Sequence, residues 1–360
     1  MSSIERNQIF EKIKTIRNNP VIAYVTSVRN GQSWSIGNDA ITSIIAAIQS
    51  IPEEFKELDF IIISNGGDPI AAQRLISFLR ERFNKITVML PYVAYSAATI
   101  LALGADEIIM HPFSNLGPVD PQLSFVKRDY MGQNTQYNYS SEDIQNYIAF
   151  LKEDVGISDQ KYLAEAIANL NADVGAIHIG GAKRSQQLSL TLSEKLLVEH
   201  TGDKGLAEKI SRQLNSLFYH HGYAVSRKEA KDMGLKVIYP DKELEGLLWK
   251  LWLDYADEMQ MNSDFDIMNE MMKQPEFQSW LENISDLEKN MYLTGTQFAT
   301  EQAAIPNTGK TIKFDSTLAC IESNYTQYKL CIHYAINVWR RPDLSIGNTS
   351  TYIMDAWKRG

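Results

Sequence analysis

Residues 86–105 read ITVMLPYVAYSAATILALGA, a stretch of twenty residues without a charge between Lys85 and Asp106. A run of this length is sufficient to cross a lipid bilayer. Pro91 interrupts it, however, and the parts on either side differ in character. ITVML is typical of a buried strand, whereas SAATILALGA is rich in helix formers and ends at Gly104. The stretch therefore predicts a buried strand, a turn and a buried helix, and not a transmembrane segment.

The sequence before and after this stretch extends the alternation of strand and helix. Strand patterns occur at residues 21–28, at the start of 58–69 and at 106–111. Helical patterns occur at residues 4–18 and 38–50, and a further helix is predicted from Pro69, with Asp68 as its N-cap. Strands that alternate with helices imply a parallel sheet covered by helices, so we expect an α/β fold.

The second half of the chain has a different organisation. The strand signal fades after residue 123, and residues 141–170 and 183–218 are largely helical. An amphipathic helix and a methionine-rich helical stretch follow residue 245, and from 292 onward a small antiparallel sheet is predicted. Cys320 and Cys331 would lie opposite each other in a two-residue hairpin. We therefore expect a domain over 1–244 and an added C-terminal α+β region over 245–360.

Composition limits the classes of function. The chain has 360 residues and a net charge of −9, which argues against a nucleic-acid-binding protein. Two cysteines provide no disulfide framework and fit a reducing compartment. The first twenty residues carry dispersed charges and no apolar core of a signal peptide. These features predict a cytoplasmic protein without a transmembrane segment.

Two loops each follow a predicted strand, SNGGDP at 64–69 and PYVAYSAAT at 91–99. In an open parallel sheet, ligands bind at the carboxyl ends of the strands. The two glycines allow backbone N–H groups to approach a ligand closely, which suits an oxyanion hole. Ser96 begins the next helix, so its hydroxyl is expected in the same space. Each feature alone is common in ordinary turns and caps, and their pairing on neighbouring strands indicates a site.

These motifs carry a family resemblance. IIISNGGDPIAAQRLISFLR (61–80) and VAYSAATILALGADEIIMHPFSNLGPVDPQL (93–123) resemble the serine dehydrogenase proteinase family, in the broad group of signal peptide peptidase A and the ClpP proteases. YAVSRKEAKDMGLKVIY (223–239) is similar to the segment that closes the ClpP-like core. The resemblance covers roughly residues 20–240. It implies a ClpP/crotonase-like fold, a serine nucleophile and often a ring-shaped oligomer.

The resemblance assigns roles by position. Ser96 is the expected nucleophile, and the backbone N–H groups of Gly67 and Ala97 form the expected oxyanion hole. Relatives often have a glycine one or two residues after the serine, where this chain has Ala97 and Ala98. Both residues are small, so we expect the tight turn to survive.

The general base has two candidates by resemblance. ClpP-type enzymes use histidine with aspartate, and the signal peptide peptidase A type uses lysine. Lys183 occupies a predicted helix that resembles the lysine-bearing helix of the group, and it must be buried to lose its proton because a free lysine has a pKa of about 10.4. His111 is the possible alternative base, although its position also suits a residue that ends a strand. Lysines in more charged surroundings are weaker alternatives: Lys127, Lys152 and Lys161.

The sequence thus predicts a serine endopeptidase with a Ser96–Lys183 dyad that acts through an acyl-enzyme. Its substrates would be unfolded or extended peptides, bound as an added strand beside the Gly67 loop. No cofactor or metal is implied, and a homo-oligomer is expected. Two alternatives remain open: a catalytically inactive ClpP-fold interaction or assembly protein, and a crotonase-type acyl-CoA enzyme.

Overall fold

One mixed sheet forms the centre of the molecule. The computed structural model describes residues 3–128, 131–216, 222–291, 308–341 and 345–359. The strand order is β10-β5-β3-β2-β1-β11-β12-β13. The parallel part consists of β1 (Val21–Thr26), β2 (Glu57–Ile63), β3 (Lys85–Leu90), β5 (Glu107–Met110) and β10 (Val237–Ile238). The antiparallel part consists of β11 (Lys310–Ser323), β12 (Gln327–Arg340) and β13 (Ile346–Met354), with the short β14 (Lys358–Arg359) also paired to β12.

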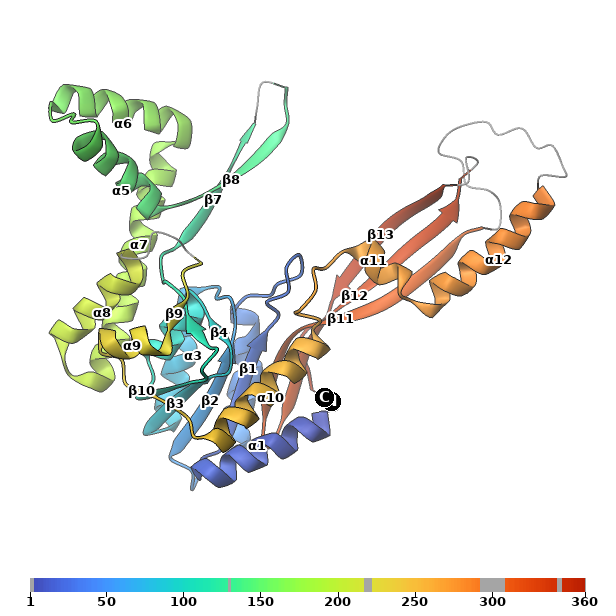
Figure 1. Cartoon of the computed structure of the whole chain (residues 1–360), viewed down its shortest axis with the longest axis horizontal. Coiled ribbons are helices and arrows are strands. Elements are labelled where there is room, and N and C mark those ends of the chain that lie inside the picture. Colours follow the sequence, from blue (N-terminus) through green and yellow to red (C-terminus); the bar gives the residue numbers. More distant parts are fainter. Residues whose placement is uncertain (1–2, 129–130, 217–221, 292–307, 342–344, 360) are drawn as a thin grey trace.

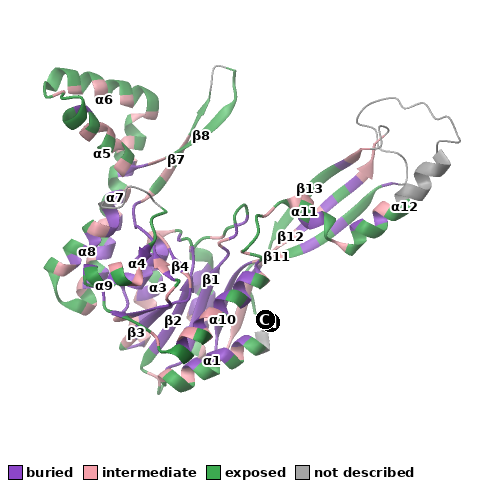
Figure 2. Cartoon of the chain, in the orientation of Figure 1, coloured by how far each residue is buried: buried purple, intermediate pink, exposed green. Residues whose placement is uncertain are grey.

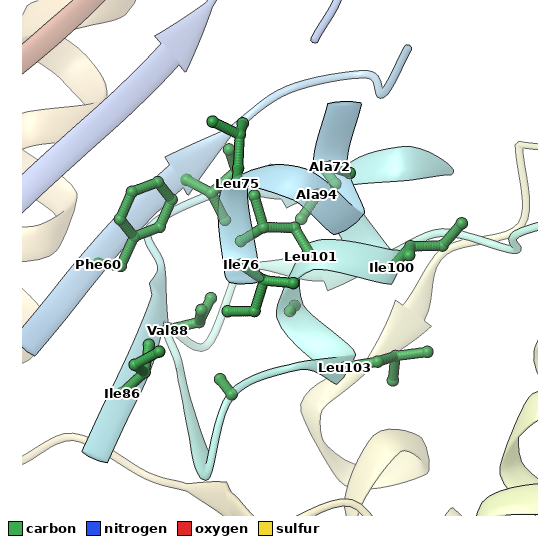
Figure 3. Close-up of a cluster of buried hydrophobic side chains, with 14 of the residues drawn as sticks. Phe60, Ala72, Leu75, Ile76, Ile86, Val88, Ala94, Ile100, Leu101 and Leu103 are labelled. Carbon is green, nitrogen blue, oxygen red and sulfur yellow. The ribbon is translucent and has the colours of Figure 1, made fainter. Parts of the chain in front are cut away.

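Helices cover both faces of the parallel strands (Figure 1). On one face lie α2 (Ile41–Ser50), α3 (Pro69–Arg82) and α4 (Ala97–Leu103), together with part of α7 (Ala176–Thr201) and α8 (Lys204–Ser216). On the other face lie α1 (Ser3–Arg17) and α10 (Lys242–Glu258). Successive strand residues face opposite sides, so Tyr24 packs under α2 and Val25 packs under α1 and α10. Figure 3 shows the first of these cores, where side chains of α3 and α4 meet those of β2 and β3.

Two arms project from this core (Figure 1). One contains the hairpin of β7 (Gln122–Arg128) and β8 (Asn134–Ser140), then α5 (Ser141–Ala149), a π-helical turn (Phe150–Asp154), α6 (Gln160–Val174) and the start of α7. The other contains the far ends of β11 to β13 with α11 (Ile267–Met272) and α12 (Pro275–Met291). Much of the first arm is exposed, as Figure 2 shows.

Small elements close the carboxyl edge of the sheet. β4 (Val93–Ala94) pairs with β6 (Asn115–Leu116), and β6 pairs with β9 (Val225–Ser226). The helix α9 (Arg227–Met233) follows β9 and ends at Gly234, which has φ 112°. A 3-10 turn, η1 (Asn38–Ala40), precedes α2. These elements surround the turns at which β2 and β3 end.

The structure confirms the α/β class, with a mixed central sheet whose parallel part is covered by helices. The charge-free stretch of residues 86–105 forms most of β3, then β4 and α4. In the described ranges, no helix combines the length and apolar character that a bilayer crossing requires.

Three expectations about later segments need correction. The strand signal does not end at residue 123, because β7 and β8 form a hairpin there. The C-terminal strands are antiparallel, but β11 pairs with β1 and continues the central sheet instead of forming a sheet of its own. Cys320 and Cys331 are not opposite each other, because the hairpin turn comprises residues 323–326, one position earlier than expected, and this pairs Cys320 with Lys329. A bulge farther from the turn then pairs Cys331 with Thr317. The division at residue 244 stays a prediction, and that residue lies inside α10.

Candidate active site

Ser96 lies in a strained turn between β4 and α4. Its backbone angles are φ 51° and ψ −117°, which a residue other than glycine rarely adopts. Such a conformation costs about 1–3 kcal/mol and persists only where its surroundings enforce it. Its amide donates to the carbonyl oxygen of Pro118 at 3.2 Å. Among the described residues, none forms a hydrogen bond with the half-buried Ser96 hydroxyl.

Buried contacts hold this turn in place. The Thr99 hydroxyl lies 2.7 Å from the carbonyl oxygen of Ala94 and accepts from the amide of Gly117 at 3.2 Å. Gly117 packs against Tyr95, so a Cβ at this position would lie only 2.5 Å from the Tyr95 ring. The start of α4 is therefore fixed to both β4 and β6, which explains how Ser96 keeps its strained backbone.

Gly66 brings the other loop directly against Ser96. Its φ is 107°, and an added Cβ would lie 2.6 Å from the Tyr95 carbonyl oxygen and 2.7 Å from the Ser96 Cβ. Both the backbone angle and the close approach require glycine here. The Gly-Gly motif thus serves two functions: its first glycine packs against the serine turn, and its second contributes an amide to the same region.

The amide of Gly67 is oriented by a bridge to Ile36. Ile36 donates to the carbonyl oxygen of Gly66 at 2.7 Å and accepts from the amide of Asp68 at 2.8 Å. The Gly66 carbonyl and the Gly67 N–H belong to one trans peptide group and point in opposite directions. Since the carbonyl points toward Ile36, the Gly67 N–H points away from it. No described residue accepts a hydrogen bond from the amides of Gly67 or Ala97.

Ser96 and Gly67 line one cavity of about 360 Å³. Its other walls come from the loop after β2, from α4, from the segment that leads into β7 and from α7. These wall residues are Asn65, Pro69, Ile100, Val119, Pro121, Gln122, Leu123, Ser185, Leu188 and Ser189. Within the described ranges, no lysine, histidine, aspartate or glutamate lines this cavity.

Lys183 lies on α7 but not in the cavity. Its side chain is exposed, and its Nζ donates to Oε1 of Gln186 at 3.4 Å. Gln186 in turn donates to Oε1 of Glu142 at 2.9 Å. Burial, and to a smaller extent the nearby Asp120, raise the pKa of Glu142. Ser185 does line the cavity. Successive residues of an α-helix are rotated by about 100°, so Lys183 points roughly 200° around α7 from Ser185. The structure therefore does not bring Lys183 to Ser96.

His111 lies on the other side of the sheet. It is 3% exposed and stacks on Trp249 of α10 at 4.9 Å, and its Nδ1 accepts from the amide of Phe113 at 3.1 Å. Burial lowers the pKa of His111 below its usual value, so the ring stays neutral near pH 7. It does not line the cavity either. His220 and His221 lie outside the described residues.

The weaker lysine candidates lie in the arm. Lys127 pairs with Asp173 at 3.0 Å, and both side chains are exposed. Lys152 and Lys161 are also exposed. Sequence reasoning did not identify the cavity wall formed by Leu123 and α7, because that wall depends on how segments far apart in the sequence pack.

Residues 3–174 match a family model described as ClpP-like SDH-type serine proteinase. The resemblance carried by the Gly66–Gly67 and Ser96 motifs is therefore confirmed.

Two uncharacterized proteins of Methanocaldococcus jannaschii, MJ1495 and MJ0137, are each 29% identical over 194 residues. Each match covers 54% of this chain and 56% or 57% of the relative, so the chain spans little more than half the length of these relatives.

A serine-to-alanine mutant of the 1510-N membrane-bound stomatin-specific protease is a distant structural neighbour, with a TM-score of 0.36 and 14% identity. The comparison covers 67% of this chain and 86% of that chain. A likeness this distant carries no argument about the site.

Proposed function

Because residues 3–174 match ClpP-like serine proteinases, we propose that the protein is a serine endopeptidase with a ClpP/crotonase-like core. The observation that carries this proposal is the strained Ser96, which lines a cavity together with Gly67 and whose hydroxyl has no hydrogen-bond partner in the part of the chain that the structure describes. Strain of this kind clusters at functional sites, where it fixes a reacting group in advance.

In the proposed reaction, Ser96 Oγ attacks the carbonyl carbon of a peptide bond and gives its proton to a general base. The carbonyl oxygen becomes an oxyanion and accepts hydrogen bonds from the amides of Gly67 and Ala97. Loss of one such donor typically slows catalysis by about 100- to 1000-fold. The intermediate expels the amine, which takes a proton, and water then hydrolyses the acyl-enzyme.

For the general base we propose Lys183, on the resemblance alone. In this role the Lys183 amine must leave Gln186, reach Ser96 and become buried. Burial is needed because it lowers the pKa of a lysine, so that the amine can lose its proton and accept that of Ser96. The matched test compares Lys183→Met with His111→Gln. Loss of hydrolysis in the first variant supports the dyad, and loss only in the second transfers the role to His111.

The proposed substrates are unfolded or extended peptides. The Gly67 N–H points away from Ile36, so this segment can pair with one more strand. The apolar walls formed by Ile100, Leu123 and Leu188 can enclose a side chain of that strand.

Hydrolysis of a fluorescently labelled unfolded protein tests the proposed function. We expect Ser96→Ala to reduce the rate at least about 1000-fold, because no other group replaces the nucleophile. Equal hydrolysis by Ser96→Ala and the unchanged protein would refute the assignment. Circular dichroism of both proteins shows whether the variant keeps its fold.

One observation favours a second candidate, a non-catalytic protein with the same fold that binds or assembles others. No titratable side chain among the described residues lines the Ser96 cavity. In that case the unchanged protein would bind an extended peptide without cleaving it, and Ser96→Ala would bind it equally well.

We also propose that the chain forms a homo-oligomer. The helix α6 has no buried residue, and Ile177 at the start of α7 is 87% exposed. Other large apolar side chains of this arm are exposed as well, among them Phe150, Val155 and Ile167, and grouped exposed apolar side chains mark interaction sites. Light scattering of the full chain should give a multiple of the monomer mass, and a monomer at micromolar concentration would contradict this.

A further inference from the structure

The C-terminal residues 355–359 form a short strap that folds back on the core. β14 pairs with β12 at Tyr328 and Lys329, beyond the end of β13. The amide of Asp355 donates to the carbonyl oxygen of Cys331 at 3.0 Å. Its carboxylate lies 2.6 Å from Nε2 of His333 and 2.6 Å from Nζ of Lys358. Backbone and side-chain contacts therefore both fix the strap.

The strap places Trp357 against the loop that precedes α2. Its ring packs edge-on to Tyr24 of β1 with ring centroids 6.2 Å apart, and it also contacts a small cluster that contains Leu318 and Leu330. The indole Nε1 donates to Oδ2 of Asp39 at 2.9 Å. A residue near the end of the sequence is thus joined to the first loop of the sheet.

Asp39 belongs to the segment that orients Gly67. It lies in η1, three residues after Ile36, and its other carboxylate oxygen occupies the space where a Cβ on Gly37 would lie. Ile36 makes both backbone hydrogen bonds that flank Gly67, at 2.7 and 2.8 Å. The loop is also tied by Asn38, whose side chain donates to Asp68 at 3.2 Å.

We propose that Trp357 is a positioning residue for the candidate active site, acting through Asp39 and Ile36 on the Gly67 amide. The inference rests on the proposed function, because it gives that amide a role in the oxyanion hole. Trp357 itself does not line the cavity. It fixes the loop on the side of Gly67 opposite to the side that would meet the substrate.

The test uses the full chain with Trp357→Phe, which keeps an aromatic ring and removes the indole donor. Hydrogen exchange is measured in peptides that contain residues 34–40 and 64–68, together with the rate of fluorophosphonate labelling of Ser96. We expect faster exchange in both segments and labelling about tenfold slower, since complete loss of an oxyanion donor has a larger effect. With a peptide substrate, kcat should fall while KM stays nearly unchanged.

Matched variants separate positioning from general damage. Asp39→Ala should reproduce the effect of Trp357→Phe. The double variant should be labelled no more slowly than either single variant, because both changes break the same hydrogen bond between Trp357 and Asp39. Asp39→Asn keeps an acceptor oxygen and should restore most of the rate. Trp339→Phe is the control, since no described residue partners its indole nitrogen.

Unchanged exchange at 34–40 and 64–68 in Trp357→Phe would overturn the inference, whatever the labelling rate. Failure of the unchanged protein to label at Ser96 would instead contradict the proposed function. The exchange measurement needs no enzymatic activity, so the two failures are distinguishable.

Discussion

Ser96 and Gly66 show how single residues build the candidate site. Ser96 has a backbone conformation that residues with a side chain rarely adopt. Gly66 has no side chain, and this allows the two loops to approach each other. The sequence predicted this pairing because glycines and a helix-starting serine follow neighbouring strands. It did not predict the strain at Ser96, which depends on buried contacts of Thr99 and Gly117 that are distant from each other in sequence.

A change of Gly66 to alanine should disable the site without unfolding the protein. The added methyl group would push against Ser96 and the Tyr95 carbonyl, and a displacement of about 1 Å can slow a reaction on the order of 100-fold. The measurement is the rate of fluorophosphonate labelling, with thermal unfolding as the check on folding. Gly246→Ala is the control because a Cβ there meets no atom within 4 Å. Labelling of a folded Gly66→Ala variant at the unchanged rate would contradict the described contact.

Asp59 gives a prediction about pH. Burial raises its pKa to about 6, against the opposing effect of Arg17. The folded pKa exceeds the unfolded value of about 3.9, so the group stabilises the fold fully below about pH 4 and loses this contribution as the pH rises through 6. Relative to Asp59→Asn, the unchanged protein should therefore gain roughly 2 kcal/mol in free energy of unfolding between pH 7 and pH 4. Urea unfolding of both proteins at the two pH values measures this, and a constant difference between them would contradict it.

At the scale of elements, the sequence predicted the features that depend on local residues and missed those that depend on tertiary packing. The start of α3 was predictable, and Asp68 does accept from the amide of Ile70 at 2.8 Å. The β7–β8 hairpin was not, because it projects from the core and its apolar alternation on β7 is short, limited to the half-buried Leu123 and Phe125. The Cys320 register was missed because no sequence signal placed the hairpin turn between Glu322 and Gln327.

The N-cap of α3 provides a prediction at this scale. Asp68→Ala should lower the free energy of unfolding by about 1 kcal/mol, because an amide in the first turn loses its acceptor. Asp68→Ser retains a capping oxygen and should recover most of that loss. Chemical denaturation measures the difference, and equal stability of the alanine and serine variants would contradict the capping role.

At the scale of the whole molecule, the first helix lies close to the last strand. Asn7 and Phe10 of α1 and Arg359 of β14 line one small pocket. Buried Arg6 of α1 pairs with Asp254 and Glu322, at 2.5 and 2.8 Å. The sequence placed these residues in different predicted domains, because ion pairs between distant segments leave no periodic pattern. Since β11 also pairs with β1, deleting residues 245–360 would remove the neighbour of β1 in the central sheet.

Replacement of Arg6 by methionine should destabilise the entire fold. It leaves buried carboxylates without their cation, which typically costs about 3–5 kcal/mol. Equilibrium unfolding in urea measures the loss, and Lys12→Met on the same helix is the control because Lys12 is exposed. Equal stability of the two variants would show that the buried cluster does not hold α1, α10 and β11 together.

The most direct measurement of the central claim is fluorophosphonate labelling followed by mass spectrometry of the modified peptide. The account predicts one adduct, on Ser96, that is absent from Ser96→Ala and strongly reduced in Gly66→Ala. A folded protein that takes up no label, or that carries its adduct on another residue while Ser96→Ala labels normally, would contradict it.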